Sequence, residues 1–292
     1  MKHTILAVTL SLANTFLPAK TKAQQTADSL ILHFWDSLPI DEYAESDDQQ
    51  TDLAAWAIDE MPAFTELLHE GVSASVTAES YSSVMEKAEK AGAESLWHCM
   101  RDMAEDCFHN PNSAFQNDEI YIPILEKLMK SRYMSGSDST RYGFQLKMLK
   151  KNRIGTIAAE LDLRIDKKTS STQVPERKRR TKKTVRLSEL CGDSTLVLFY
   201  DPTCEHCREQ IEEFGNNEHI TGLCKRGILR MVFVNVEPKR KNKNVWGKDL
   251  PDGWVFATDY RQAVIKQHIY YLPFVPQLYI LGKGRVVRGR KL

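Results

Sequence analysis

The sequence predicts an all-α domain in its N-terminal half and an α/β domain in its C-terminal half. Residues 24–150 carry apolar side chains at helical spacing, with few Gly and Pro. From residue 154 onward the pattern changes to strand-like alternation, and continuous apolar runs then alternate with helical stretches. We therefore expect a helical domain over residues 24–150 and an α/β domain over residues 151–292.

Residues 1–23 have the features of a secretory signal peptide. Lys2 precedes a mostly apolar stretch from Ile5 to Leu17, and the small-residue ending Thr21-Lys22-Ala23 follows. The apolar stretch is shorter than the ~20 residues that span a bilayer. We expect a periplasmic or otherwise exported protein with no stable membrane insertion after cleavage. An uncleaved signal, acting as an N-terminal anchor, is the alternative.

The balance of basic and acidic residues indicates which kinds of partner the chain can attract. The chain has 40 Lys and Arg residues against 39 Asp and Glu residues. This balance gives the whole chain no electrostatic attraction for nucleic acid, so we expect no nucleic-acid partner. Six cysteines are too few for a disulfide framework in an exported chain of 292 residues. Each cysteine is therefore interpreted on its own.

The N-terminal half contains three helix-like stretches. Two of them cover Ile120–Met129 and Tyr142–Leu149. The third places five residues on one stripe of a helix: Leu96, Cys99, Met100, Met103 and Cys107. The acidic segment Asp41–Asp52 and the turn Asn110-Pro111-Asn112 are the expected breaks between helices.

The C-terminal half begins with a strand and a basic linker. Residues 158–165 alternate apolar with charged side chains, as a half-buried strand does. The linker, residues 167–186, contains a basic run from Arg177 to Arg186. We interpret the linker as a solvated hairpin loop that joins two strands. A docking site for an acidic surface is the alternative.

The rest of this half predicts alternating strands and helices. In chain order we expect a strand Thr195–Tyr200, a helix Cys204–Lys225 ended by Gly227, a strand Ile228–Val236, a helix Tyr260–Tyr271, and strands Leu278–Leu281 and Arg285–Arg288. Because no helix follows Gly282-Lys283-Gly284, this segment is a hairpin turn rather than a phosphate-binding loop.

A C-x-x-C motif, Cys204-Glu205-His206-Cys207, lies at the junction of a predicted buried strand and a helix. The unpaired N–H groups and partial positive charge of a helix N-terminus favour a thiolate at Cys204. A thiolate is the species that attacks disulfides. Cys207 lies one helical turn further on and can resolve a mixed disulfide by attacking Cys204.

The two residues between the cysteines act in opposite directions. A protonated His206 favours the Cys204 thiolate, whereas the charge of Glu205 disfavours it. Half of a zinc site is the alternative interpretation of the motif, with Cys224 and His219 as further ligands. Both of these side chains fall on the same predicted helix or at its end, which disfavours zinc. We expect no metal and no cofactor.

The segment from Leu196 to Cys207 resembles the active-site segment of thioredoxin-like proteins, especially the exported reductases of the TlpA and ResA type. The resemblance covers about half of the chain. It implies that Val275-Pro276 is the cis-proline loop that faces the cysteines and pairs with substrate backbone. Pro273 is the competing candidate. A cis X-Pro bond costs little relative to the trans form.

The sequence departs from this family at several positions. Leu198 stands where thioredoxins carry a buried acid, and Gln210 stands where ResA-type proteins carry a glutamate. Thr203 replaces the usual tryptophan. The usual proton acceptor for the resolving thiol is therefore missing, and we expect slow resolution unless another carboxylate serves. The family also has a last helix beyond the point where this sequence ends, so we expect a longer chain or another element over that sheet face.

The N-terminal half also resembles a known family. The segments Phe34-Trp35-Asp36, Asn110-Pro111-Asn112-Ser113 and Tyr121–Glu126 are similar to an uncharacterised helical domain of unknown function in exported bacterial proteins. That domain precedes thioredoxin-like domains. The resemblance implies a two-domain layout and export to a periplasm, and it implies no activity for the helical domain.

The other four cysteines have structural interpretations. Cys99 and Cys107 are separated by about 12 Å along one helix, beyond the ~7 Å limit for a disulfide, and are expected to be core thiols. Cys191 precedes a buried strand, and Cys224 ends the active-site helix. We expect both to be buried, with a third redox thiol as the alternative.

Together these observations predict an exported thiol-disulfide oxidoreductase that reduces protein disulfides. Its expected partners are a protein thiol or disulfide substrate and an upstream electron donor. The expected site consists of Cys204, Cys207, His206, Glu205 and Val275-Pro276. The alternative is a non-enzymatic interaction or scaffold protein that uses the same fold.

Overall fold

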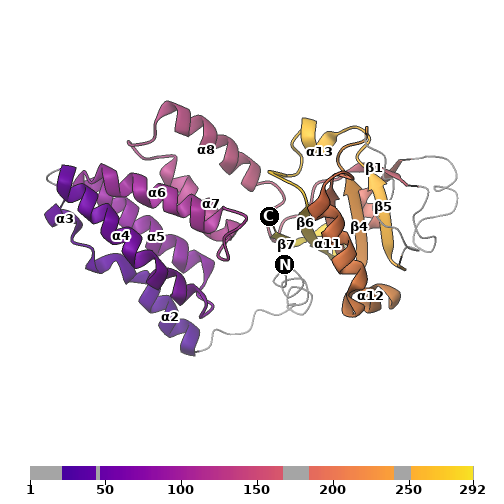
Figure 1. Cartoon of the computed structure of the whole chain (residues 1–292), viewed down its shortest axis with the longest axis horizontal. Coiled ribbons are helices and arrows are strands. Elements are labelled where there is room, and N and C mark those ends of the chain that lie inside the picture. The colour runs from indigo at the N-terminus through magenta and orange to yellow at the C-terminus, as the bar shows by residue number, and fades with distance from the viewer. Residues whose placement is uncertain (1–21, 44–46, 167–183, 240–250, 292) are drawn as a thin grey trace. The chain divides into compact units, whose positions relative to one another are not determined.

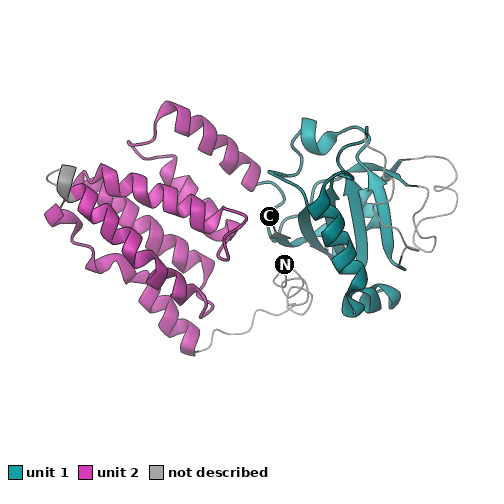
Figure 2. Ribbon diagram, viewed as in Figure 1, with its two compact units in different colours: residues 1–16, 151–292 teal, residues 17–150 magenta. Residues whose placement is uncertain are grey.

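The computed structural model describes residues 22–43, 47–166, 184–239 and 251–291. The chain forms two compact units, and the boundary lies between Lys150 and Lys151 (Figure 2). We call them the N-terminal unit and the C-terminal unit and describe each by itself. Most of the expected signal peptide, residues 1–21, and most of the basic linker, residues 167–183, lie outside the described residues.

All elements described in the N-terminal unit are helices (Figure 1). In chain order they are α2 (Lys22–Leu32), the 3-10 helix η1 (Phe34–Ser37), α3 (Ile40–Tyr43), α4 (Asp47–Leu68), α5 (Ala74–Ala91), α6 (Glu94–Phe108), α7 (Asp118–Leu128) and α8 (Gly136–Leu149). The three helix-like stretches of the sequence correspond to α6, α7 and α8, although α7 ends at Leu128, one residue before the expected Met129. The expected break over Asp41–Asp52 is wrong in extent, because α3 continues to Tyr43 and α4 begins at Asp47 within this segment. Acidic residues stabilise the first turn of a helix.

An aromatic cluster forms the centre of the N-terminal unit. Trp35, Phe64, Tyr81 and Phe108 are buried. Ring centroids lie 5.1 Å apart for Trp35 and Phe64, 5.9 Å for Phe64 and Tyr81, and 5.5 Å for Tyr81 and Phe108. Such ring pairs contribute packing free energy beyond the area they bury.

The buried stripe of α6 differs from the predicted stripe. Its fully buried residues are Leu96, Trp97, Met100, Ala104 and Phe108. Cys99, Met103 and Cys107 are only partly buried. The large rings of Trp97 and Phe108 bury more apolar area than the sulfur-containing side chains. The helix is therefore oriented with these two rings toward the core.

The C-terminal unit is built on one mixed sheet of seven strands in the order β2-β1-β5-β4-β3-β6-β7. The strands are β1 (Asp162–Ile165), β2 (Thr184–Arg186), β3 (Ser194–Tyr200), β4 (Arg230–Asn235), β5 (Trp254–Thr258), β6 (Gln277–Gly282) and β7 (Val287–Lys291). β3, β4 and β5 are parallel, whereas the β1–β2, β1–β5, β3–β6 and β6–β7 pairs are antiparallel. The described helices are α10 (Leu187–Leu190), α11 (Glu205–Asn216), α12 (Glu218–Lys225) and α13 (Ala263–Lys266), and the 3-10 helix η2 (Lys283–Arg285) joins β6 to β7.

Several predicted elements of this unit are confirmed. The strands expected over Thr195–Tyr200 and Ile228–Val236 are β3 and β4. The glycine turn connects the antiparallel pair β6 and β7. β1 and β2 pair on either side of the basic linker, as a hairpin would. The last three residues of the expected linker are nevertheless strand β2, so the linker ends before Thr184 rather than at Arg186.

Two predicted helices are wrong in extent. The helix expected over Cys204–Lys225 is broken at Asn217, whose side chain accepts a hydrogen bond from Ile220 N at 3.0 Å. Asparagine is a strong N-cap, so it begins α12 as a separate helix. The helix expected over Tyr260–Tyr271 is reduced to α13, because Gln262 and His268 on either side of it have positive φ angles of 55° and 50°.

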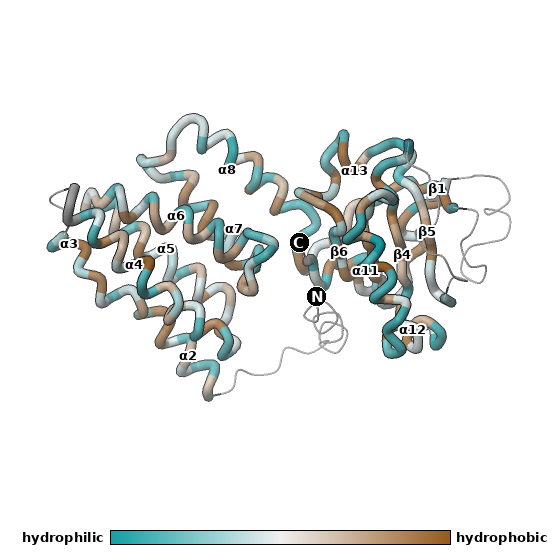
Figure 3. The backbone as a smooth tube through the Cα atoms, in the orientation of Figure 1, coloured by the Kyte–Doolittle hydropathy of each residue, from teal (hydrophilic) through white to brown (hydrophobic). Residues whose placement is uncertain are grey.

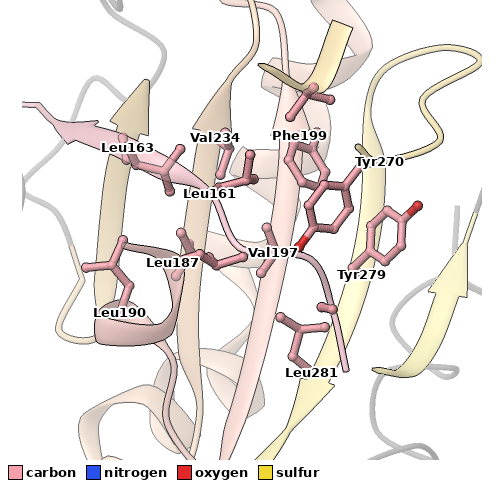
Figure 4. Close-up of a cluster of buried hydrophobic side chains, with 14 of the residues drawn as sticks. Leu161, Leu163, Leu187, Leu190, Val197, Phe199, Val234, Tyr270, Tyr279 and Leu281 are labelled. Carbon is pink, nitrogen blue, oxygen red and sulfur yellow. The ribbon is translucent and has the colours of Figure 1, made fainter. Parts of the chain in front are cut away.

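Alternating side chains divide the core of the C-terminal unit between the two faces of the sheet. One face of β3 presents Val197 and Phe199, and Phe199 packs with Tyr270 and Tyr279 (Figure 4). The other face presents Leu196 and Leu198, covered by side chains of α11 and α12. Figure 3 shows the resulting contrast, with hydrophobic central strands and a largely hydrophilic α11.

We expect Phe199→Ala to destabilise the C-terminal unit by about 3–5 kcal/mol, since it removes a buried ring from a close-packed core. The Phe199 ring is fully buried and lies 4.8 Å from the Tyr270 ring. Urea denaturation followed by circular dichroism measures the change. Ile265→Ala is the control, because Ile265 is 39% exposed. A Phe199→Ala variant as stable as this control would contradict the packing described here.

Candidate functional site

A tight turn links the end of β3 to the start of α11 and carries the first cysteine. The Asp201 carbonyl oxygen accepts a hydrogen bond from Cys204 N at 3.1 Å. The Asp201 carboxylate accepts from Thr203 N at 2.8 Å and from Thr203 Oγ1 at 2.9 Å. Asp and Asn side chains commonly close such turns through the backbone N–H two residues on. Asp201 therefore closes the turn through its main chain and its side chain, and the turn fixes the position of Cys204.

Cys204 is the N-cap residue of α11. Its sulfur accepts a hydrogen bond from Cys207 N at 3.2 Å. The sulfur thus occupies the place that a Ser or Asp oxygen takes in an ordinary cap, opposite the free N–H groups of the first turn. A negative charge on this atom is favoured by the helix dipole.

The loop before β6 lies beside Cys204 because of the strand register. β6 runs antiparallel to β3 with Gln277 opposite Phe199, which brings the preceding residues to the end of β3. The Val275-Pro276 bond is cis, as predicted, and Cys204 Sγ donates to Val275 O at 3.8 Å. Pro273, the competing candidate, is exposed and is not part of a cis bond.

Cys207 is fully buried beneath Cys204. It belongs to the apolar cluster that includes Leu198, Ile211 and Phe214. Burial raises the pKa of the Cys207 thiol well above its usual range, and the hydrogen bond to the Cys204 side chain raises it further. Cys207 is consequently a neutral thiol at pH 7. Cys204, by contrast, is partly exposed.

His206 and Glu205, the residues between the cysteines, are exposed on the first turn of α11. His206 Nδ1 lies 3.1 Å from Glu209 Oε2, and the His206 side chain is 85% exposed. The structure therefore brings together Cys204, Cys207 and Val275, and it pairs His206 with Glu209.

The two positions at which the sequence departs from the family pattern have clear environments. Leu198 is buried in the apolar cluster under α11. The Gln210 side chain donates to Glu213 Oε2 at 3.0 Å.

Asp201 is the residue that the sequence interpretation missed. Its place three residues before Cys204, where a strand ends and a helix begins, was the available signal.

The other cysteines have the environments of structural thiols. Burial raises the pKa of Cys191 and of Cys224 to about 11. Burial likewise raises the pKa of Cys107 to about 12 and, less strongly, that of Cys99. Thiols with raised pKa values form little thiolate at neutral pH and react slowly.

Comparisons with known proteins agree with this architecture. Residues 17–152 match the family model of a domain of unknown function (DUF5106). The crystal structure of a thioredoxin-like protein from Bacteroides caccae ATCC 43185 matches 96% of this chain and 94% of its own, with a TM-score of 0.72 and 22% identity. No protein of curated function matches the chain.

Two further solved structures match about half of the chain. One is a putative thiol:disulfide interchange protein DsbE from Chlorobium tepidum, with 16% identity, a TM-score of 0.36 and coverage of 48% of this chain and 85% of its own. The other is the thioredoxin domain of a thiol-disulfide oxidoreductase from Bacteroides vulgatus, with 14% identity, a TM-score of 0.34 and coverage of 48% and 89%.

The C-terminal unit has a thioredoxin-like fold, with the parallel strands β3 and β4, the C-x-x-C helix between them in the chain, and the antiparallel strands β6 and β7. The match of residues 17–152 to the DUF5106 model agrees with the expected resemblance of this half to a helical domain of unknown function. Across the four described ranges, no helix has the length and apolar character needed to cross a membrane.

We expect iodoacetamide at pH 7 to label Cys204 at least about tenfold faster than Cys207 in the reduced protein, because the thiolate is the reactive species. The raised pKa of Cys207 keeps it protonated at this pH, and the difference in rate should shrink as the pH rises. Mass spectrometry of the labelled peptides measures both rates. Equal labelling of the two cysteines at pH 7 would contradict the geometry, and Cys207→Ser controls for the rate at Cys204.

Proposed function

We propose that the C-terminal unit is a thiol-disulfide oxidoreductase that reduces protein disulfides through Cys204 and Cys207. The observation that carries this proposal is the position of Cys204. It caps α11, its sulfur accepts the Cys207 N–H, and it lies 3.8 Å from Val275 O of the cis-proline loop. A partly exposed sulfur above a buried second thiol is the arrangement that a two-step exchange needs.

The proposed reaction has two steps. The Cys204 thiolate attacks one sulfur of a substrate disulfide and forms a mixed disulfide, while the other substrate sulfur leaves as a thiolate. Cys207 then attacks Cys204, forms the internal disulfide and releases the second substrate thiol. Val275 and Pro276 bind the substrate backbone beside Cys204, and His206 and Glu205 adjust the charge around it. An upstream electron donor returns Cys204 and Cys207 to the dithiol.

We propose further that the protein is exported, with residues 1–23 as a signal peptide. Residues 24–150 then form an all-α domain, and residues 151–292 form the redox domain. The helices of the first domain, which include α5 and α6 around the aromatic cluster, support this division. The expected substrates are protein disulfides of the periplasm or cell surface.

A non-enzymatic scaffold is the second candidate function. Leu198 and Gln210 favour it, since neither side chain can accept the proton of the resolving thiol. The retained cysteine pair and its cap geometry favour the enzyme. Turnover with a protein disulfide distinguishes the two functions.

We expect Cys204→Ser to abolish the protein-dependent reduction of a model protein disulfide with dithiothreitol as electron donor, because the remaining thiol of the motif, Cys207, is buried and protonated at pH 7. Cys207→Ser should accumulate mixed disulfides at Cys204, since nothing resolves them. Mass spectrometry identifies the trapped species. Cys191→Ser makes the same chemical change outside the motif and should leave turnover unchanged. Full activity in Cys204→Ser would exclude Cys204 as the nucleophile and favour the scaffold function.

A further inference from the structure

Asn152 is a buried residue that joins two distant segments of the C-terminal unit, and its side chain is 8% exposed. Its Nδ2 donates to the Ile269 carbonyl oxygen at 2.8 Å, and its Oδ1 accepts from Ala159 N at 2.7 Å. Ile269 and Ala159 both lie outside the described helices and strands. The Asn152 backbone has a positive φ of 51°, a conformation that Asn adopts more readily than most residues other than Gly. The amide therefore serves backbone groups that no helix or sheet ladder pairs.

The residues on either side of Ile269 are bound to the same part of the chain. Lys151 Nζ donates to the His268 carbonyl oxygen. Tyr270 Oη donates to the Ala159 carbonyl oxygen at 2.6 Å. Three consecutive residues, 268–270, are thus bound by one short stretch at the start of the unit. We call Lys151, Asn152 and Ala159 the clamp, because each of them makes a hydrogen bond to this segment or fixes a residue that does.

The segment bound by the clamp leads directly into the cis-proline loop. The Tyr270 ring lies 5.1 Å from the Tyr279 ring (Figure 4). Tyr279 Oη in turn donates to the Tyr271 carbonyl oxygen at 3.3 Å. Val275, whose carbonyl oxygen contacts Cys204 Sγ, follows later in the same loop. The loop is therefore anchored where the chain enters it, and the pairing of β6 with β3 anchors it where the chain leaves.

We propose that Asn152 is a positioning residue for the substrate-binding loop of the candidate site. The inference rests on the oxidoreductase function proposed above, in which Val275 and Pro276 bind the substrate backbone. A loop that is already ordered binds a chain without the entropic cost of ordering itself at that moment. Asn152 supplies this order at Ile269, where secondary structure does not. It acts through the loop and not on the reacting sulfur atoms.

Asn152→Gly tests this role in the full chain. Glycine adopts a positive φ without strain, so the variant loses both side-chain hydrogen bonds and keeps its backbone conformation. With dithiothreitol as electron donor, we expect the KM for a model protein disulfide to rise about tenfold, because the substrate then has to order the loop. The reaction of Cys204 with Ellman's reagent, a small disulfide that carries no polypeptide backbone, should stay within about twofold of the wild-type rate.

Two further variants make the test specific. Gln262→Gly also replaces an amide side chain at a positive φ, here 55°, and this side chain does not cap α13, so the KM should stay unchanged. Asn152→Asp keeps the acceptor for Ala159 N, but a carboxylate has no hydrogen to donate to Ile269. Its KM should rise as in Asn152→Gly. Protonation at lower pH restores a donor, so the KM of this variant relative to the wild type should then fall again.

Hydrogen exchange tests the clamp without relying on activity. Peptides that cover residues 268–278 should exchange their amides faster in Asn152→Gly than in the wild type, whereas peptides from α11 should be unchanged, as mass spectrometry can measure. An unchanged KM, unchanged exchange in this segment, or an equal loss of rate with Ellman's reagent and with the protein disulfide would each overturn the assignment of Asn152. A wild-type protein that reduces no protein disulfide would instead overturn the proposed function, and the exchange rates would still decide whether Asn152 orders the loop.

Discussion

The antiparallel pairing of β6 with β3 is the constraint on which the candidate site depends. Phe199 lies opposite Gln277, so the chain that enters β6 comes level with the chain that leaves β3. A shift of one residue would turn every β6 side chain to the other face of the sheet. It would move Tyr279 away from Phe199 and Tyr270, and it would separate Val275 from Cys204. The core on one face thus holds the register that the site requires.

The sequence was sufficient to predict those elements whose structure depends on the chemistry of neighbouring residues in the chain. Continuous apolar runs predicted β3 and β4, because a strand that is covered on both faces of the sheet carries apolar side chains on both faces. The strand, C-x-x-C and helix order predicted the Cys204 cap, and the resemblance predicted the cis bond at Pro276.

The remaining features depend on contacts that a linear pattern does not contain. β5 was missed because its five residues, Trp254–Thr258, gain strand character only between β4 and β1. The helix break at Asn217 depends on one side-chain cap, and the apolar period continues across it. The turn closed by Asp201 was equally invisible, because its hydrogen bonds with Thr203 form only once the chain turns at the end of β3.

The contact between Cys204 Sγ and Val275 O has a consequence for the order of events at the site. In the reduced protein the thiol proton of Cys204 occupies this carbonyl oxygen. Once Cys204 ionises, as the proposed attack requires, that proton is gone and both lone pairs of the oxygen are available to other donors. A backbone N–H of the substrate chain can then donate to it. In the proposed reaction, ionisation of Cys204 thereby frees the acceptor that aligns the substrate, and return of the proton to Cys204 occupies this oxygen again.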